Sequence, residues 1–326
     1  MMVNDHSNNL SGQHKSSRAE IQDIFLTFAK ALEENNLSSV KSYFTPDAKA
    51  NFSNLGEFNG VDTIVDGLVR EGTKIEVARF KITNSYVAVS KKQAQQSAYL
   101  MGVFANDMGG KGELDTFLFG GHFVNSYVHT TEGWKISYLR FELDWQHGNF
   151  NYVTNWKLTD GIVGWHPKAV APTILSELDA PWRVLPNPDD RGTDEEKVIE
   201  TYLRYSWALD QADFSLLTTV FTEEAKADMS PFGPMSGRKE IVSLLKILRS
   251  GQPYMQHAAT NFKVKVTGDT ATMDIYRVVP FNPNRENLDA QIFGARYESR
   301  LRREEGVWKF EWLHYIPGWI TEGKNI

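Results

Sequence analysis

The 326-residue sequence contains no cysteine. Disulfides, a thiolate nucleophile and a cysteine-ligated zinc site are therefore excluded. No apolar run approaches the roughly 18 residues that a membrane-spanning helix needs. The formal net charge is -6, so the basic surplus typical of proteins that bind nucleic acid is also missing. We expect neither a membrane nor a nucleic acid as the partner of this chain.

Signals for cofactors are equally absent. No glycine fingerprint of a dinucleotide-binding loop follows a predicted strand, and none of the eight histidines has the spacing of a metal ligand set. We expect no cofactor and no metal. Residues 1–17 are polar and have no apolar segment. They predict a disordered tail rather than a signal peptide, which favours a cytoplasmic location.

What the sequence does contain is an internal repeat. Segments of the first half recur in the second half at an offset of 177 residues, and at 174 near the end of each copy. The matched pairs are Phe28 with Tyr205, Glu33 with Asp210, Phe44-Thr-Pro-Asp-Ala48 with Phe221-Thr-Glu-Glu-Ala225, Gly60 with Gly237, Thr83-Asn84 with Thr260-Asn261, Trp134-Lys135 with Trp308-Lys309, and Trp145 with Trp319. A repeat of this length indicates two copies of one domain plan.

The second copy shows the plan most clearly. Apolar residues recur at helical spacing over 196–210, Asp213 is placed to cap a second helix that runs through Phe221, and a third helix begins near Gly237. From His257 onward the apolar period changes to two, which predicts four strands joined largely as hairpins. Each copy is therefore expected to be an α+β unit with three helices packed on a curved antiparallel sheet.

The repeat divides the chain into four parts. We expect a disordered tail at 1–17, a first domain at 18–145, an ordered interdomain linker at 146–193 and a second domain at 194–326. The linker has no clear period but carries five prolines and three tryptophans. Because so many large apolar side chains are unusual in a solvated connection, we expect the linker to pack across the domain junction.

Motifs of the second copy resemble a known family. They are Tyr205-x4-Asp210, Phe221-Thr-Glu-Glu-Ala225, Gly237-Arg238, His257-x2-Thr260-Asn261, Gly294-Ala-Arg-Tyr297 and Glu305-Gly-Val-Trp308-Lys-Phe310. These motifs resemble the SnoaL-like branch of the nuclear transport factor 2-like proteins, which includes scytalone dehydratase, hexachlorocyclohexane dehydrochlorinase and bile acid 7α-dehydratase. The resemblance implies two tandem cone-shaped domains. It does not select one reaction, because the family spans lyases, isomerases, hydrolases and plain binders.

The resemblance also implies a catalytic pair. In the dehydratases of this family a carboxylate and a histidine face each other in the cone, and Asp210 and His257 match these positions. A histidine accepts a proton at neutral pH, and a buried aspartate fixes its tautomer. Tyr205 would point into the cone and hydrogen-bond a carbonyl or a departing hydroxyl. The residues alone leave other roles open: a structural histidine, an aspartate that caps a helix and a tyrosine of the core.

Substrate binding is assigned to Tyr297, Phe221, Met229 and Phe293. Tyr297 follows Arg296 directly on a predicted strand. Successive side chains of a strand point to opposite faces, so only one of these two can enter the cavity, and we favour Tyr297.

The first copy lacks the pair. Phe28 replaces the tyrosine, Glu33 replaces the aspartate, and Phe80 stands where the repeat places His257. We interpret this copy as a degenerate partner whose packing replaces the dimer contact common in the family. The chain would then be a pseudo-dimer, and a further homo-oligomer stays possible. His122 could serve a pocket from another strand, which would be a different site.

Two functions from different classes follow. The first is a cofactor-independent lyase or isomerase that uses Asp210 and His257 to abstract a proton from a small hydrophobic compound bearing a hydroxyl or a carbonyl. The second is a non-catalytic small-molecule-binding or scaffold protein, which the eroded first copy favours. Epoxide hydrolysis is a third possibility, and it would need further polar groups around a water, such as Asp274 and Tyr276.

Overall fold

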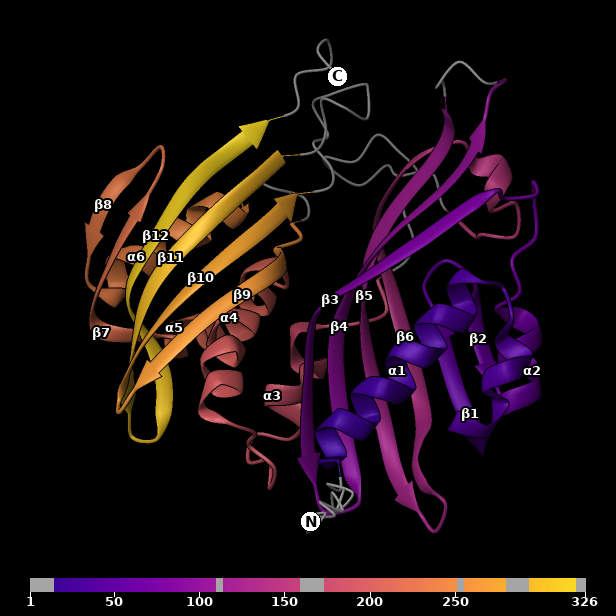
Figure 1. The fold of residues 1–326 in the computed structure, drawn as a ribbon, viewed down its shortest axis with the longest axis horizontal. Helices are drawn as coiled ribbons and strands as arrows, with labels where there is room; N and C mark the ends of the chain where they lie inside the picture. The colour runs from indigo at the N-terminus through magenta and orange to yellow at the C-terminus, as the bar shows by residue number, and fades with distance from the viewer. Residues whose placement is uncertain (1–14, 110–113, 159–172, 251–254, 280–292, 321–326) are drawn as a thin grey trace, which may run out of the picture.

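A computed structural model describes residues 15–109, 114–158, 173–250, 255–279 and 293–320. Within these ranges the chain forms two α+β domains in tandem, each with helices packed against a six-stranded sheet (Figure 1). The predicted α+β class and the tandem arrangement are therefore confirmed. Most of the predicted tail, residues 1–14, lies outside the described residues.

Domain 1 is built from the first copy of the repeat. Its elements are α1 (Ser17–Glu33), the 3-10 helix η1 (Leu37–Tyr43), β1 (Phe44–Phe52), β2 (Gly56–Asn59), α2 (Val61–Gly67), β3 (Val77–Ser90), β4 (Gln93–Asp107), β5 (Leu114–Thr130) and β6 (Gly133–Gly148). The sheet has the order β2-β1-β6-β5-β4-β3. Its last four strands form the hairpin series that the alternating sequence predicts.

Domain 2 repeats this plan. Its elements are α4 (Asp194–Asp210), α5 (Phe214–Thr219), β7 (Phe221–Met229), β8 (Gly233–Ser236), α6 (Arg238–Ser250), β9 (Ala258–Thr267), β10 (Thr270–Val279), β11 (Phe293–Glu304) and β12 (Val307–Ile320). The sheet order is β8-β7-β12-β11-β10-β9, which matches domain 1 strand for strand.

The prediction of a four-stranded antiparallel sheet was wrong in one respect. Two further strands lie between the second and third helical segments of each domain, and β1 and β7 run parallel to β6 and β12. Phe221, which we placed in the second helix, begins β7. The alternation of β7 starts only at Ala225, because the exposed pair Glu223 and Glu224 interrupts it. An interrupted period over nine residues is a weak strand signal.

Side chains cap the start of helix α4 and the start of the helix that follows it. Thr193 and Glu196 form a capping box, in which each side chain accepts a hydrogen bond from the other residue's main-chain N–H. After α4, the Asp213 carboxylate accepts from the N–H of Leu216 and caps α5, as predicted. The start of α4 fixes its register, and this register places Asp210 at its last turn.

Domain 1 covers the outer side of α4. Figure 1 shows α4 between the two sheets. Tyr86, Tyr99 and Val124 extend from the face of the domain 1 sheet that is opposite its own core, and they share one buried apolar cluster with Tyr202 and Trp207 of α4. A helix predicted to have one apolar face is therefore buried on two sides.

The described part of the linker contacts both domains. It forms two 3-10 helices, η2 (Phe150–Tyr152) and η3 (Glu177–Asp179), and the short helix α3 (Pro181–Val184). Trp182 stacks on Tyr86 of domain 1 with ring centroids 4.6 Å apart, and its indole N–H donates to Glu200 of α4. Trp182 therefore joins the two domains by packing and by a hydrogen bond.

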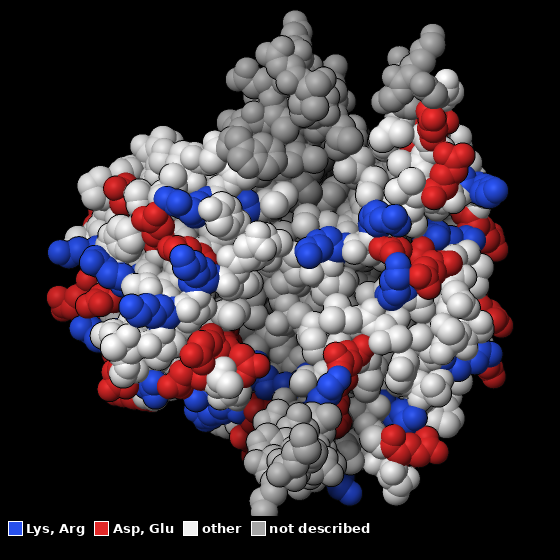
Figure 2. All heavy atoms as spheres, viewed as in Figure 1, with Lys and Arg blue, Asp and Glu red and all other residues white. Residues whose placement is uncertain are grey.

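Among the described residues on the face drawn in Figure 2, acidic and basic side chains are interspersed over both domains. No helix within the described ranges combines the length and the apolar character needed to cross a membrane.

Candidate active site in domain 2

Asp210 and His257 face each other inside domain 2. Asp210 is the last residue of α4, and His257 directly precedes β9. Asp210 Oδ1 lies 2.5 Å from His257 Nδ1, and Asp210 Oδ2 accepts a hydrogen bond of 2.8 Å from the main-chain N–H of His257. The exposed fractions of the two side chains are 1% and 2%. The structure thus brings together two residues that lie 47 positions apart.

The surroundings favour a neutral histidine beside an ionised aspartate. Burial and the positive charge of Arg277 lower the pKa of His257, although the Asp210 carboxylate acts in the opposite direction. Burial opposes ionisation of Asp210 as well, but its hydrogen bonds with His257 and Tyr99 hold the pKa of this carboxyl below its ordinary value. The proton of the neutral ring therefore lies on Nδ1, towards the carboxylate. Nε2 keeps a lone pair that can accept a proton.

A cavity of about 170 Å³ adjoins His257. Its lining is mostly apolar, with several polar groups. The lining residues are Tyr205, Leu209, Met229, Ser230, Phe232, Leu245, Leu248, Met255, His257, Arg277, Tyr297 and Tyr315. An apolar pocket with a few convergent polar groups is the usual form of a small-molecule site.

Three of the proposed site residues besides His257 line this cavity. Tyr205, Met229 and Tyr297 do so, and the ring of Tyr205 lies 6.0 Å from that of His257, measured between centroids. Phe221 is fully buried behind Tyr205, with the two ring centroids 6.1 Å apart, and does not line the cavity. Phe293 begins β11, and its side chain lies outside what the structure describes.

Strand geometry decides between the neighbours Arg296 and Tyr297. Tyr297 is buried inside the domain, whereas Arg296 is at the surface and pairs with Glu298. The same alternation excludes the residues suggested for epoxide hydrolysis. Tyr276 is 50% exposed, and Asp274, two residues away, lies on the same outer face of β10.

Arg277 is the site residue that sequence reasoning missed. It is 8% exposed, lines the cavity, and its Nε has no hydrogen-bond partner among the described residues. Burial opposes its charge, yet Coulombic interactions with Tyr297, Tyr202 and Asp210 hold the pKa of Arg277 above its ordinary value. The available signal was its spacing of two from Ile275 on an alternating strand.

The equivalent region of domain 1 has the same main-chain contacts as the site but lacks its polar side chains. The Glu33 carboxylate accepts a hydrogen bond of 2.5 Å from the main-chain N–H of Phe80, as Asp210 does from His257. Arg70 donates to the last carbonyls of α1, as Arg249 does to those of α4. These contacts recur in both domains, so they belong to the fold.

The polar side chains of the site do not recur. At the repeat offsets, His257, Arg277, Tyr205 and Tyr297 correspond to Phe80, Leu100, Phe28 and Phe123. The cavity of domain 1 is only about 40 Å³, and the rings of Phe80, Phe104 and Phe119 pack there with centroids less than 6 Å apart. This volume holds one or a few waters, but no organic ligand.

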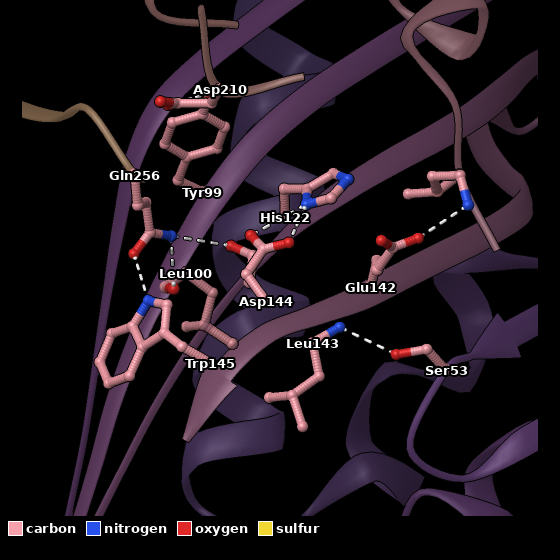
Figure 3. Close-up of polar contacts among 12 residues, drawn as sticks. Ser53, Tyr99, Leu100, His122, Glu142, Leu143, Asp144, Trp145, Asp210 and Gln256 are labelled. Atoms are coloured by element: carbon pink, nitrogen blue, oxygen red, sulfur yellow. Dashed lines mark hydrogen bonds and ion pairs between the residues drawn. The ribbon is translucent and has the colours of Figure 1, made fainter. Parts of the chain in front are cut away.

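His122 takes part in a second polar cluster, at the junction of the domains (Figure 3). Its Nδ1 lies 2.9 Å and 3.0 Å from the two carboxylate oxygens of Asp144, and Glu142 accepts two main-chain N–H groups from Ile174 and Leu175. Burial opposes protonation of the ring, but Asp144 raises the pKa of His122.

This cluster is the one group among the described residues with three potential metal ligands close together. Donor atoms of His122, Glu142 and Asp144 lie within 4.8 Å of one another. Nδ1 of His122 bonds Asp144, and one oxygen of Glu142 accepts from the main chain, so these contacts form a hydrogen-bonded network at the junction. Nε2 of His122 is buried and has no hydrogen-bond partner among the described residues.

Comparisons with known proteins found relatives that match parts of this chain. An uncharacterized protein of Mycobacterium tuberculosis is 36% identical over 121 residues, which cover 36% of this chain and 80% of that protein, and one of Mycobacterium bovis matches equally. A solved structure from Novosphingobium aromaticivorans, provisionally assigned as a scytalone dehydratase, is 14% identical and covers 47% of this chain and 89% of its own, with a TM-score of 0.35.

Another solved structure, from Streptomyces avermitilis, is provisionally assigned as a dehydratase of the NTF2-like family. It is 21% identical and covers 38% of this chain and 95% of its own, with a TM-score of 0.33. The model of the SnoaL-like domain matches this chain twice, over residues 13–140 and 190–314. The chain therefore belongs to the family of SnoaL-like domain proteins, with two such domains in tandem.

Proposed function

We propose that this protein is a cofactor-independent lyase or isomerase, whose site in domain 2 abstracts a proton from a small, largely apolar compound that bears a hydroxyl or a carbonyl. One observation carries the proposal. The imidazole of His257 lies 2.5 Å from a buried carboxylate and lines a mostly apolar cavity, where burial and Arg277 lower its pKa. Family membership supports a ligand-binding or an isomerase and dehydratase role in general, and the dehydratase assignments of the compared structures agree with it.

His257 acts as the general base in this mechanism. Its Nε2 accepts a proton from a carbon next to an electron-withdrawing group, while Asp210 stabilises the imidazolium that forms. The electron pair of the broken C–H bond forms a double bond. In a dehydration the imidazolium gives this proton to the departing hydroxyl, which leaves as water, and His257 returns to its neutral form. In an isomerisation the imidazolium returns the proton at another carbon.

Arg277 and the tyrosines serve the oxygen atom of the substrate. The guanidinium of Arg277 has an N–H without a partner among the described residues, and Tyr205 and Tyr297 carry hydroxyls on the same cavity. Donors of this kind stabilise negative charge that develops on a carbonyl or on a departing hydroxyl, and they do so most strongly where water is excluded. Burial also raises the pKa of Tyr205 well above its ordinary value, so its hydroxyl stays protonated.

The size of the cavity limits the substrate. About 170 Å³ is close to the roughly 150 Å³ of a cavity that encloses one benzene ring. We therefore expect the reacting part of the substrate to be a single ring or a short chain. A polycyclic compound would have to extend out of the cavity.

The test is a turnover screen by mass spectrometry with single-ring and polycyclic hydroxy and carbonyl compounds, on the wild type and on His257→Gln. We expect loss of water or isomer formation by the wild type, and a rate lower by about 10²–10⁴ in the variant. Phe80→Leu is the control, since it alters the corresponding position of domain 1 without placing a polar group among Phe104 and Phe119. Equal turnover by His257→Gln and the wild type would refute the proposal.

The second candidate is a non-catalytic binding protein. The observation that favours it is the carboxylate of domain 1, which makes the same main-chain contact without any imidazole. Asp210 thus has a structural role whether or not the protein is an enzyme. Binding of a screened compound without chemical change, at equal affinity in wild type and His257→Gln, would support this candidate.

A further inference from the structure

The carboxylate of Asp210 is held from the other domain as well as from its own. The hydroxyl of Tyr99, on β4 of domain 1, donates a hydrogen bond of 2.8 Å to Asp210 Oδ2 (Figure 3). Tyr99 is 2% exposed, and its pKa lies well above the ordinary value, because burial and the Asp210 carboxylate both oppose its ionisation. The phenol therefore stays protonated and donates to Asp210, so this hydrogen bond comes from domain 1.

Domain 1 also holds the segment that carries His257. The Asn84 amide donates to the main-chain carbonyl of His257 at 2.9 Å and accepts from the N–H of Ala259 at 2.8 Å. Gln256, the residue before the histidine, accepts from the indole N–H of Trp145. Its amide donates in turn to the carbonyls of Leu100 and Gly121 on β4 and β5. Three residues at or beside the imidazole, Gln256, His257 and Ala259, are thus held by hydrogen bonds from the neighbouring domain.

Domain 1 supports the site of domain 2 through these side chains, but their counterparts in domain 2 do not support domain 1. The repeat gives Tyr99 and Asn84 the counterparts Tyr276 and Asn261 in domain 2. Tyr276 is 50% exposed and Asn261 is exposed, whereas Tyr99 and Asn84 are buried. Domain 2 therefore does not offer the same support to Glu33 of domain 1. The asymmetry matches the chemistry, because the supported domain is the one with the imidazole and the larger cavity.

We propose that domain 1 serves as a positioning domain for the site of domain 2, and that Tyr99 is the positioning residue that orients the Asp210 carboxylate towards His257. The catalytic consequence rests on the proposed function, but the positioning itself can be measured without any substrate. A carboxylate with two donors on Oδ2 presents Oδ1 to the imidazole in one orientation. Without the phenol, only the N–H of His257 fixes this orientation.

The perturbation is Tyr99→Phe in the full chain, and Tyr127→Phe is the matched control. Tyr127 is equally buried, but its hydroxyl donates to Gln96 within the core of domain 1. Both variants remove one buried hydroxyl and keep the ring, so they impose a similar structural cost. Only the first removes a donor from Asp210.

The readout is the titration of the His257 ring, followed by histidine nitrogen NMR. The groups that face this ring are Asp210 and Tyr205 on α4, Arg249 on α6, Arg277 on β10 and Tyr297 on β11. Loss of the Tyr99 donor leaves more negative charge on Asp210, so we expect His257 to bind its proton about threefold more tightly, a pKa rise of roughly 0.5. We also expect a changed Nδ1–H chemical shift. Tyr127→Phe should leave both unchanged.

The outcomes separate the two proposals. A His257 signal in Tyr99→Phe that matches the wild type would overturn the positioning role, whatever the turnover screen shows. A shifted signal with no turnover by the wild type would support positioning and count against the lyase. If the wild type is active, Tyr99→Phe should lower kcat about tenfold or more with KM little changed, and it should move the acidic limb of the pH profile by the same 0.5.

Discussion

Replacement of Asp210 by asparagine tests the tautomer on which the proposed chemistry depends. In the native protein Oδ2 accepts from the N–H of His257 and from Tyr99, and Oδ1 faces Nδ1 of the ring. An asparagine oxygen can take the place of Oδ2, which directs the amide N–H₂ at Nδ1. Since two donors cannot share a hydrogen bond, Nδ1 must then accept and the ring proton must move to Nε2.

The size of the effect follows from the three hydrogen bonds of Asp210. Each would change from a bond to a charged group to a bond between neutral groups, at a cost of about 1 kcal/mol. The variant no longer buries a charge, and this gain offsets part of the loss. We expect Asp210→Asn to lower the free energy of unfolding by about 1–3 kcal/mol. The proton on Nε2 blocks the base, so we expect turnover to fall on the order of 10³–10⁴-fold.

The assay combines urea denaturation with histidine nitrogen NMR near pH 7.5. Glu33→Gln is the control, because Glu33 makes the corresponding main-chain contact in domain 1 without an imidazole. It should cost stability but leave the tautomer of His257 and the turnover unchanged. A His257 ring that keeps its proton on Nδ1 in Asp210→Asn, or an active variant, would refute the reasoning.

Three further predictions concern charge and packing. His257 should titrate below 6.5 and His122 above it. The stability that His257 contributes is then complete above about pH 6.5 and is lost as the pH falls further. The stability that His122 contributes is complete below about pH 6.5 and is lost as the pH rises through its raised pKa. Histidine NMR and urea denaturation midpoints measured across pH check both signs. Arg277→Met should raise the pKa of His257, because it removes a buried positive charge, and an unchanged titration would contradict this. Gly121→Ala should lower the free energy of unfolding by about 1–3 kcal/mol in urea denaturation, because its Cβ would lie 2.2 Å from the carbonyl of Glu142; a native midpoint would contradict this.

The repeat made much of the fold predictable. The shared offset predicted two tandem domains. The cap at Asp213 and the alternation of β9 and β10 were predictable because these signals act over a few residues. The parallel pairing of β7 with β12 was missed, because partners about 90 residues apart leave no periodic mark on either strand. Short helices that run into a strand at Phe221 also blur the boundary between helix and strand.

The candidate site was predictable only in part. The resemblance suggested the pairing of Asp210 with His257, and the internal comparison showed that domain 1 lacks the imidazole. The contact of Tyr99 with Asp210 joins two domains across 111 residues, and nothing in the period of β4 distinguishes an outer face that meets another domain from one that meets water. Arg277 was missed for a different reason: a charged side chain at an inward position contradicts the ordinary apolar pattern of a core strand.

The two domains together separate what the fold requires from what the chemistry requires. The carboxylate at the end of the first helix, its bond to a main-chain N–H and the arginine that binds the last helical carbonyls occur in both. Among the described residues, domain 2 combines an imidazole, a buried guanidinium, two phenols and a cavity of about 170 Å³, whereas the corresponding cavity of domain 1 is about 40 Å³ and is lined by Phe80 and Leu100 at the positions of the imidazole and the guanidinium. Buried polar groups of this kind cost stability, and domain 1 folds with apolar side chains at each of these positions. Since the fold does not need these groups, their presence around one cavity is best explained by a ligand, and the variants above determine whether that ligand is also transformed.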